Sequence, residues 1–215
     1  MTHARLASNP YIDAAFPLAE LRRLADEAVK HGRWMIRADN DGVSPSSSAN
    51  GFRWAPPGHW TTAPDFNTRQ ECGGGLHGQD ATWGGYSEGT RLVFCEHRGG
   101  YVGGIDGNKV KVESARILLV GELPLGLQIN GSLDLHGCDL TGVTLPQSVG
   151  GSLNLSGCDL TGITLPQHVG GSLDLHGCNL TGVTLPQSVG GSLYLSGCDL
   201  TGITLPQSVG GEIYK

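Results

Sequence analysis

The sequence predicts a small α+β domain over residues 1–120, followed by a β-solenoid over residues 131–215 in which one 20-residue repeat forms one coil. The first observation behind this prediction is a strict period, marked by Gly131, Gly151, Gly171, Gly191 and Gly211. The second is composition, because 35 glycines and only 6% aromatic residues leave much of the chain without the side chains of an ordinary core. The third is a mixture of one helical and several strand patterns before residue 120.

The N-terminal part contains one clear helix pattern and three strand patterns. Pro17 suits the first position of a helix, an apolar stripe follows it, and Gly32 can end it. Strands are expected at 33–38, 91–97 and 109–120, where apolar and β-branched residues gather or alternate with charges. These elements together indicate one small α+β domain.

Each repeat divides into four blocks of five residues, which read LDLHG, CDLTG, VTLPQ and SVGGS in the first copy. Three of the blocks place leucine at the centre with an apolar residue two positions earlier. This alternation predicts an inward ring of side chains, formed in the first repeat by Leu133, Leu135, Cys138, Leu140, Val143, Leu145 and Val149. One coil buries too little to offset the entropy of ordering it, so the coils must stack. Residues 121–130 are expected to be a junction or a degenerate first coil.

The blocks resemble those of the pentapeptide-repeat family, and CDLTG matches the family's block at every position. The resemblance implies a right-handed parallel β-helix in which four blocks make one square turn. The block SVGGS departs from the pattern, and a proline in each repeat is unusual for it (Pro146, Pro166, Pro186 and Pro206). The spacing LxLxxCxLTxxxLP is also similar to leucine-rich repeats, which imply a leucine-rich-repeat solenoid as the alternative.

Stacked coils place equivalent side chains in ladders about 4.8 Å apart. The candidate binding surface is formed by acidic and threonine positions of the repeats, namely Asp134, Asp139, Asp159, Asp174, Asp199, Thr144, Thr164, Thr184 and Thr204. Residues 131–215 hold six acidic residues and a single basic one, Lys215. That charge balance argues against direct binding of the repeats to nucleic acid.

Four of the six cysteines occupy one repeat position and are expected to be reduced, buried packing residues (Cys138, Cys158, Cys178 and Cys198). A zinc site is the alternative for another set, Cys72, His77, Cys95 and His97. A strand over 91–97 would place Cys95 and His97 on one face. The favoured interpretation is a glycine turn beside a buried thiol, so no metal or other cofactor is predicted.

The stretch ECGGGLHG, residues 71–78, is the most distinctive part of the N-terminal domain. Residues 51–120 resemble uncharacterised domains of actinobacteria and their phages, which often precede repeat segments. The same stretch, with Tyr86 and Glu96, is similar to the GxGxY…E layout of ADP-ribosyltransferases. That similarity implies His77, Tyr86 and Glu96 as catalytic candidates and NAD as the cofactor.

Function is therefore expected to reside in a surface. The favoured hypothesis is a non-enzymatic interaction or structural protein whose rigid acidic solenoid binds a protein partner. One version is a DNA mimic, because some pentapeptide-repeat proteins present acidic faces to topoisomerases, and another is a phage-associated role. An ADP-ribosyltransferase acting through the N-terminal domain is the alternative. No apolar run approaches the length of about 18 residues of a membrane span. A cytoplasmic or virion-associated protein is expected, with homo-oligomerisation open.

Overall fold

Helix α1, Leu18–Lys30, begins directly after Pro17 and buries Leu21, Ala25 and Ala28. Gly32 ends it with a φ of 62°, a left-handed conformation that favours glycine. The helix packs against β4 and β5 of the N-terminal sheet. The computed structural model describes residues 16–40, 52–71, 74–84, 89–106 and 109–215.

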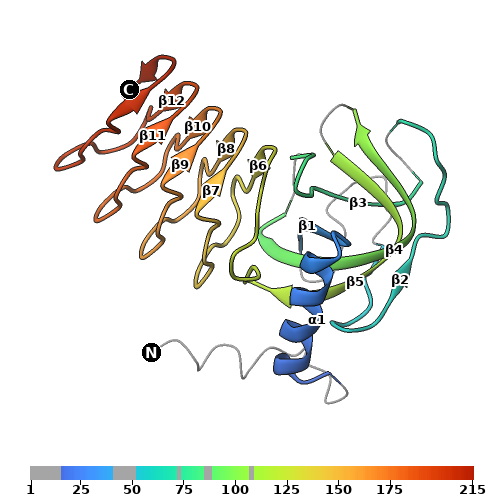
Figure 1. The fold of residues 1–215 in the computed structure, drawn as a ribbon. Coiled ribbons are helices and arrows are strands. Elements are labelled where there is room, and N and C mark those ends of the chain that lie inside the picture. Colours follow the sequence, from blue (N-terminus) through green and yellow to red (C-terminus); the bar gives the residue numbers. More distant parts are fainter. Residues whose placement is uncertain (1–15, 41–51, 72–73, 85–88, 107–108) are drawn as a thin grey trace.

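The N-terminal sheet is built on two long antiparallel strands, β4 (Arg91–Ile105) and β5 (Lys109–Val120). β1 (Trp34–Asp39) pairs with the other edge of β4, and the short strands β2 (Thr61–Thr62) and β3 (Leu76–Gly78) both pair with β5. A bridge between Ile36 and Gln79 joins the segment after β3 back to β1. The pairings β1–β4–β5–β3 therefore run round a closed ring of strands (Figure 1).

Alternation along β4 gives the sheet two cores. Leu92 and Phe94 face α1 and belong to a core that continues without interruption into the repeats. Val93 and Cys95 face the other way, into a second core with buried residues of β1 and β5 (Met35, Val110, Val112, Ala115 and Ile117). The first core joins the N-terminal part to the repeats, whereas the second belongs to the N-terminal part alone.

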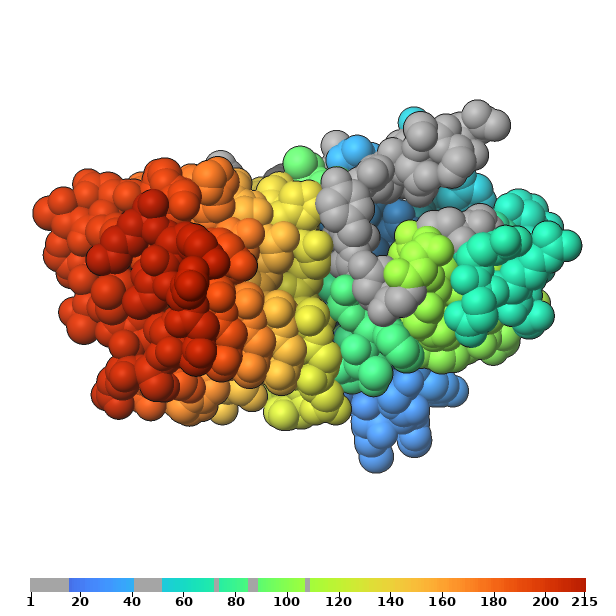
Figure 2. Space-filling view, turned by 90° about the horizontal axis from the view of Figure 1, so that it is seen from above, coloured from blue at the N-terminus to red at the C-terminus, as the bar shows by residue number. Residues whose placement is uncertain are grey.

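The repeats form the predicted β-solenoid, in which every coil contributes short strands to two parallel sheets. One sheet contains β6 (Leu133–Asp134), β8 (Leu153–Asn154), β10 (Leu173–Asp174), β12 (Leu193–Tyr194) and β14 (Ile213–Tyr214). The other contains β7 (Ser148–Val149), β9 (His168–Val169), β11 (Ser188–Val189) and β13 (Ser208–Val209). Equivalent residues pair in register, such as Leu153 with Leu173. The coils stack as one column beside the N-terminal part (Figures 1 and 2).

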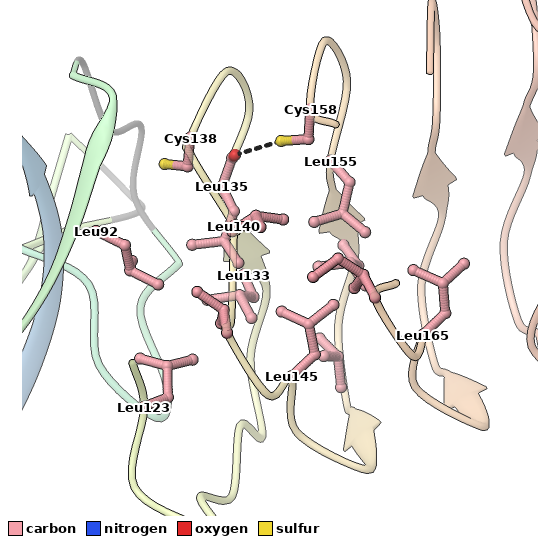
Figure 3. Close-up of a cluster of buried hydrophobic side chains, with 14 of the residues drawn as sticks. Leu92, Leu123, Leu133, Leu135, Cys138, Leu140, Leu145, Leu155, Cys158 and Leu165 are labelled. Atoms are coloured by element: carbon pink, nitrogen blue, oxygen red, sulfur yellow. Dashed lines mark hydrogen bonds between the residues drawn. The ribbon is translucent and has the colours of Figure 1, made fainter. Parts of the chain in front are cut away.

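The interior of the column follows the block pattern of the sequence. In the first repeat the third and first positions of three blocks are buried: Leu133, Leu135, Cys138, Leu140, Val143 and Leu145. The fourth block differs, because its buried residue is Val149 at the second position. The leucines of successive coils stack on one another and on Leu92 and Leu123 at the N-terminal side (Figure 3). The coils thus bury each other's open faces, which a single coil would leave exposed to solvent.

Two kinds of glycine make the coil possible. Gly142 has a φ of 80° and lies in a turn in which the Val143 N–H donates to the Leu140 carbonyl at 2.9 Å. Positive φ at that turn position is a role for glycine. Gly170 serves a different purpose, since a Cβ there would overlap the carbonyl oxygen of Gly150 in the preceding coil. Each repeat therefore uses glycine both for a positive φ and for the close approach of neighbouring coils.

The first coil meets segments of the N-terminal part in place of a preceding coil. Ile129 pairs in parallel with Val149, so the junction supplies a neighbour for the second sheet. Asp139 donates its backbone N–H to the Thr90 carbonyl at 2.7 Å, and Arg91 forms a parallel bridge with Asp139. The segment 121–130, expected to be a degenerate first coil, thus forms only part of the layer on which the first coil packs. The rest of this layer comes from segments that are distant in the chain.

Gln79 completes that layer with its side chain. In the first sheet, the Asn154 carbonyl accepts a hydrogen bond from the Leu135 N–H of the preceding coil at 2.9 Å. The equivalent carbonyl of Asp134 accepts from Gln79 Nε2 at 2.7 Å, and the Asp134 N–H donates to Gln79 Oε1 at 3.0 Å. Gln79 is only 2% exposed, so its amide caps an edge that solvent does not reach.

Candidate functional site

The outer acidic row of the solenoid is built into its turns. Asp159 Oδ1 accepts a hydrogen bond from the Thr161 N–H at 3.0 Å, and Asp199 Oδ1 accepts from Thr201 at 2.9 Å. Asn179 makes the same bond to Thr181 at 3.0 Å, because an amide oxygen accepts as a carboxylate does. Asparagine in the third repeat therefore preserves the turn that aspartate makes in the other repeats while it removes the charge.

These hydrogen bonds affect the protonation of the exposed carboxylates. The side-chain and backbone bonds from Thr161 lower the pKa of Asp159, and the backbone and side-chain bonds from Thr201 lower the pKa of Asp199. Both residues are exposed. The row consequently holds oriented negative charge at neutral pH.

Asp134 and Asp174 occupy the first sheet and make a second set of turns. Their Oδ1 atoms accept from the backbone N–H groups of His136 and His176, at 3.1 and 2.9 Å. In the fourth repeat this position is Tyr194, whose ring stacks on Tyr214 with centroids 4.9 Å apart. The threonine row is exposed in all four repeats (Thr144, Thr164, Thr184 and Thr204). The predicted surface residues thus lie outside the column, on more than one row.

The repeat cysteines are packing residues of the column: Cys138, Cys158 and Cys178 are buried, as predicted, and Cys198 is partly buried. Cys158 Sγ donates to the Leu135 carbonyl of the preceding coil at 3.0 Å (Figure 3). Cys178 makes the equivalent bond to the Leu155 carbonyl at 3.1 Å. All four repeat cysteines and Cys95 are free thiols. Burial raises the pKa of Cys138 to about 12 and that of Cys158 to about 11, so both remain protonated at neutral pH.

The candidate zinc ligands are only partly within the described residues, because Cys72 lies outside them. Cys95 is fully buried on β4, and the buried His97 ring stacks on Tyr101 with centroids 5.5 Å apart. His77 is on β3. Within the described ranges, no group of three or more metal-binding side chains comes together.

The catalytic candidates have separate surroundings. Glu96 is 6% exposed and accepts from Arg116 through one carboxylate oxygen at 2.6 and 2.8 Å, while its other oxygen lies 3.2 Å from Arg33. His77 lies among the groups Arg37, Lys109 and Lys111, which act on its ring. Tyr86 lies outside the described residues. Glu96 and His77 therefore have different charged neighbours.

Arg37 is a buried charged residue that the sequence interpretation missed. It is only 8% exposed, and its guanidinium lies over the Trp54 ring, 4.4 Å from the centroid. Its Nη1 donates to the His77 carbonyl at 3.3 Å. The strand pattern of 33–38 could have indicated a buried arginine, because Arg37 lies there among apolar residues.

Comparison with known proteins adds no assignment: no family model matches the chain, and no match is found among curated proteins or among solved structures. In the described parts of the chain, no helix has both the length and the apolar character to cross a membrane. The fold and the contacts above are therefore the basis of the functional argument.

Proposed function

We propose that this chain is a non-enzymatic interaction protein whose solenoid presents a rigid acidic surface to a protein partner. The observation that carries the proposal is the orientation of the outer carboxylates. Asp159 and Asp199 are exposed, yet each is held by a turn bond to the backbone. Fixed charges lose little freedom on binding, so they favour a partner with complementary basic groups.

The rigidity of the surface comes from the packing behind it. A single apolar core runs from α1 through the coils to Leu195, so the acidic row is anchored to the N-terminal part. Residues 131–215 carry six acidic side chains against one lysine, which selects a basic protein surface over a phosphate backbone. The burial of alternate positions in three blocks supports the resemblance to pentapeptide repeats, and with it the DNA-mimic version of this function.

The contacts of Glu96 give less support to the ADP-ribosyltransferase alternative. Both of its carboxylate oxygens engage arginines, Arg116 and Arg33. A glutamate that orients a ribose must offer an oxygen to the ligand. A phage-associated role is compatible with the proposed surface and is part of the same proposal.

The test is to remove charge from the surface without removing the turns. We expect the double variant Asp159→Asn, Asp199→Asn to fold normally, since Asn179 makes the same bond. Affinity capture with cross-linking, followed by identification of the bound proteins, compares it with wild type. The matched control is Gln167→Ala, Gln207→Ala, which changes exposed uncharged residues on the same coils outside the candidate binding surface.

We expect a basic partner that wild type and the glutamine control retain and that the asparagine variant loses. A gyrase supercoiling assay tests the DNA-mimic version, with inhibition by wild type and weaker inhibition by the asparagine variant. Partner retention that is equal in all three proteins would overturn the proposed acidic surface.

A further inference from the structure

Exposed aromatic side chains gather at one place on the solenoid, on the last two strands of its first sheet. Tyr194 of β12 and Tyr214 of β14 are 37% and 42% exposed, and they pair in register across the sheet. Leu193, beside Tyr194, is fully buried, so the tyrosines occupy the outward positions of their strands. Both strands lie at the end of the column away from the N-terminal part (Figure 1). A contiguous exposed aromatic surface of this kind is typical of a binding site.

Tyr194 replaces a residue that stabilises a turn in the other repeats. At the equivalent position of the second repeat, Asn154 Oδ1 accepts a hydrogen bond from the Ser156 N–H at 3.0 Å. Asp134 and Asp174 make the same bond in the first and third repeats. A tyrosine cannot make it, because its only side-chain oxygen lies at the far end of the ring. The fourth repeat therefore gives up a turn bond for an exposed ring, which indicates that the ring serves a purpose other than folding.

The ring of Tyr194 has one face covered by Tyr214 and the other face turned toward the coil that holds Asp174. The two rings are 4° from parallel, and their centroids are 4.9 Å apart. On the other side, Asp174 pairs in register with Tyr194 at the coil spacing of about 4.8 Å. The aspartate side chain is much shorter than the tyrosine ring. The ring therefore extends outward past the carboxylate, and its outer part is accessible to a partner.

A carboxylate lies next to each tyrosine. Asp174 is partly exposed and uses its Oδ1 to accept from the His176 N–H at 2.9 Å. Glu212 is exposed, and its hydrogen bond with the Tyr214 hydroxyl raises the pKa of Tyr214. The hydroxyl therefore stays protonated at neutral pH, and the negative charge lies on the carboxylates. An aromatic ring beside a carboxylate suits a guanidinium group, because this planar cation can stack on the ring and donate to the carboxylate oxygens at once.

We propose that the pair Tyr194 and Tyr214, with Asp174 beside it, recognises an arginine side chain of the protein partner. The guanidinium stacks on the outer part of the Tyr194 ring and donates to the Asp174 carboxylate, while Glu212 adds negative charge at the other end of the pair. Lysine fits this site less well, since its ammonium group carries charge but has no planar surface to stack. This inference rests on the proposed acidic surface, and it narrows the partner from a basic protein to one that presents arginine.

The experiment uses the full chain and measures binding by isothermal titration calorimetry at low, constant ionic strength. The probes are two blocked hexapeptides of equal charge, one of alternating arginine and glycine and the other of alternating lysine and glycine. Tyr194→Asn removes the ring and introduces the turn residue of the second repeat, and Asp174→Asn removes the charge but keeps the turn acceptor. Gln187→Ala is the matched control, because Gln187 is an exposed, uncharged residue of the third coil outside the site.

We expect wild type and the Gln187→Ala variant to bind the arginine peptide about fivefold or more tightly than the lysine peptide. The Tyr194→Asn variant should bind both peptides with similar affinity. It should nevertheless melt close to wild type, since the restored turn bond offsets the lost ring contact. The Asp174→Asn variant should bind the arginine peptide several-fold more weakly than wild type, because the guanidinium loses its carboxylate acceptor.

Three results would overturn the arginine site: no binding of the arginine peptide by wild type, equal affinity of wild type for the two peptides, or an arginine preference that survives Tyr194→Asn. The acidic surface has a separate readout, which is the partner captured by wild type and lost by the Asp159→Asn, Asp199→Asn variant. Failure of the arginine site and failure of the acidic surface are therefore distinguishable.

Discussion

The side-chain amide of Gln79 makes, with the backbone of Asp134, a pair of hydrogen bonds that joins the solenoid to the N-terminal ring of strands. Its own backbone is paired with Ile36 of β1 at 2.7 and 2.8 Å. One buried residue thus fixes the edge of β6 relative to β1. Because neighbouring coils are stacked in register, the position of the first coil sets that of the others.

Substitution of Gln79 by alanine should destabilise the whole column. It leaves the buried N–H and carbonyl of Asp134 without partners, at a cost of about 2–4 kcal/mol in the free energy of unfolding. Urea unfolding followed by circular dichroism measures the change. Gln147→Ala is the control, since Gln147 is an exposed glutamine of the solenoid and should change stability little. Equal stability of the two variants would contradict the capping role.

The two kinds of repeat glycine should respond differently to alanine. Gly162→Ala places a side chain where nothing lies within 4 Å, so its cost is the strain of a φ of 75°, about 1 kcal/mol. Gly170→Ala places a methyl group against the carbonyl oxygen of Gly150 in the preceding coil. The two coils can relieve this overlap only if they move apart. We expect a loss of about 3 kcal/mol or more, or failure to fold. Thermal unfolding ranks the variants, and the reverse order would refute close coil approach.

Stability should fall on the acid side partly through the turn carboxylates. The pKa values of Asp159 and Asp199 are lowered in the folded protein from 3.8, so their contribution is complete above the unfolded value. It is lost as pH falls through the lowered native values. The Asp159→Asn, Asp199→Asn variant should therefore show a smaller drop in urea midpoint below pH 4. Identical acid profiles would rule out this linkage.

The repeat thiols should be protected from alkylation while the protein is folded. The pKa of Cys158 is raised to about 11 by burial, against 9.0 for an ordinary thiol. At pH 8 its thiolate population is about a hundredfold lower, and access is also blocked. Mass spectrometry after iodoacetamide treatment should find Cys158 labelled in urea and unlabelled without it. Rapid alkylation of Cys158 in the folded protein would show that the coil opens or that the thiol is exposed to solvent.

Glu96 should prove structural. Glu96→Gln weakens the pairs with Arg116 and Arg33 and should cost about 2–4 kcal/mol, measured by urea unfolding. Incubation with labelled NAD should give no ADP-ribose transfer by wild type or variant. Transfer by wild type that the variant abolishes would instead favour the enzymatic alternative.

The solenoid could be predicted from sequence because its contacts recur at one spacing. Leu133 and Leu135 have equivalents in every repeat, so their shared environment is visible as a period. The phase of the fourth block was harder to predict, since Val149 follows no leucine pattern. Strand 109–120 was predicted in full as β5, whereas the expected 91–97 extends to Ile105 in β4 because its partner strand continues. Pairing partners are long-range, and local pattern alone cannot extend a strand.

The sequence by itself determined the column, its period, its buried leucines and thiols, and the acidity of its exterior, because each depends on residues close in the chain or repeated along it. Only the tertiary structure decided that Gln79 would meet Asp134, 55 positions away, and that Arg37 would be enclosed with Trp54 and His77. Those contacts join segments without a common pattern. They depend on the closure of strands into a ring, which brings together residues that are distant in the chain.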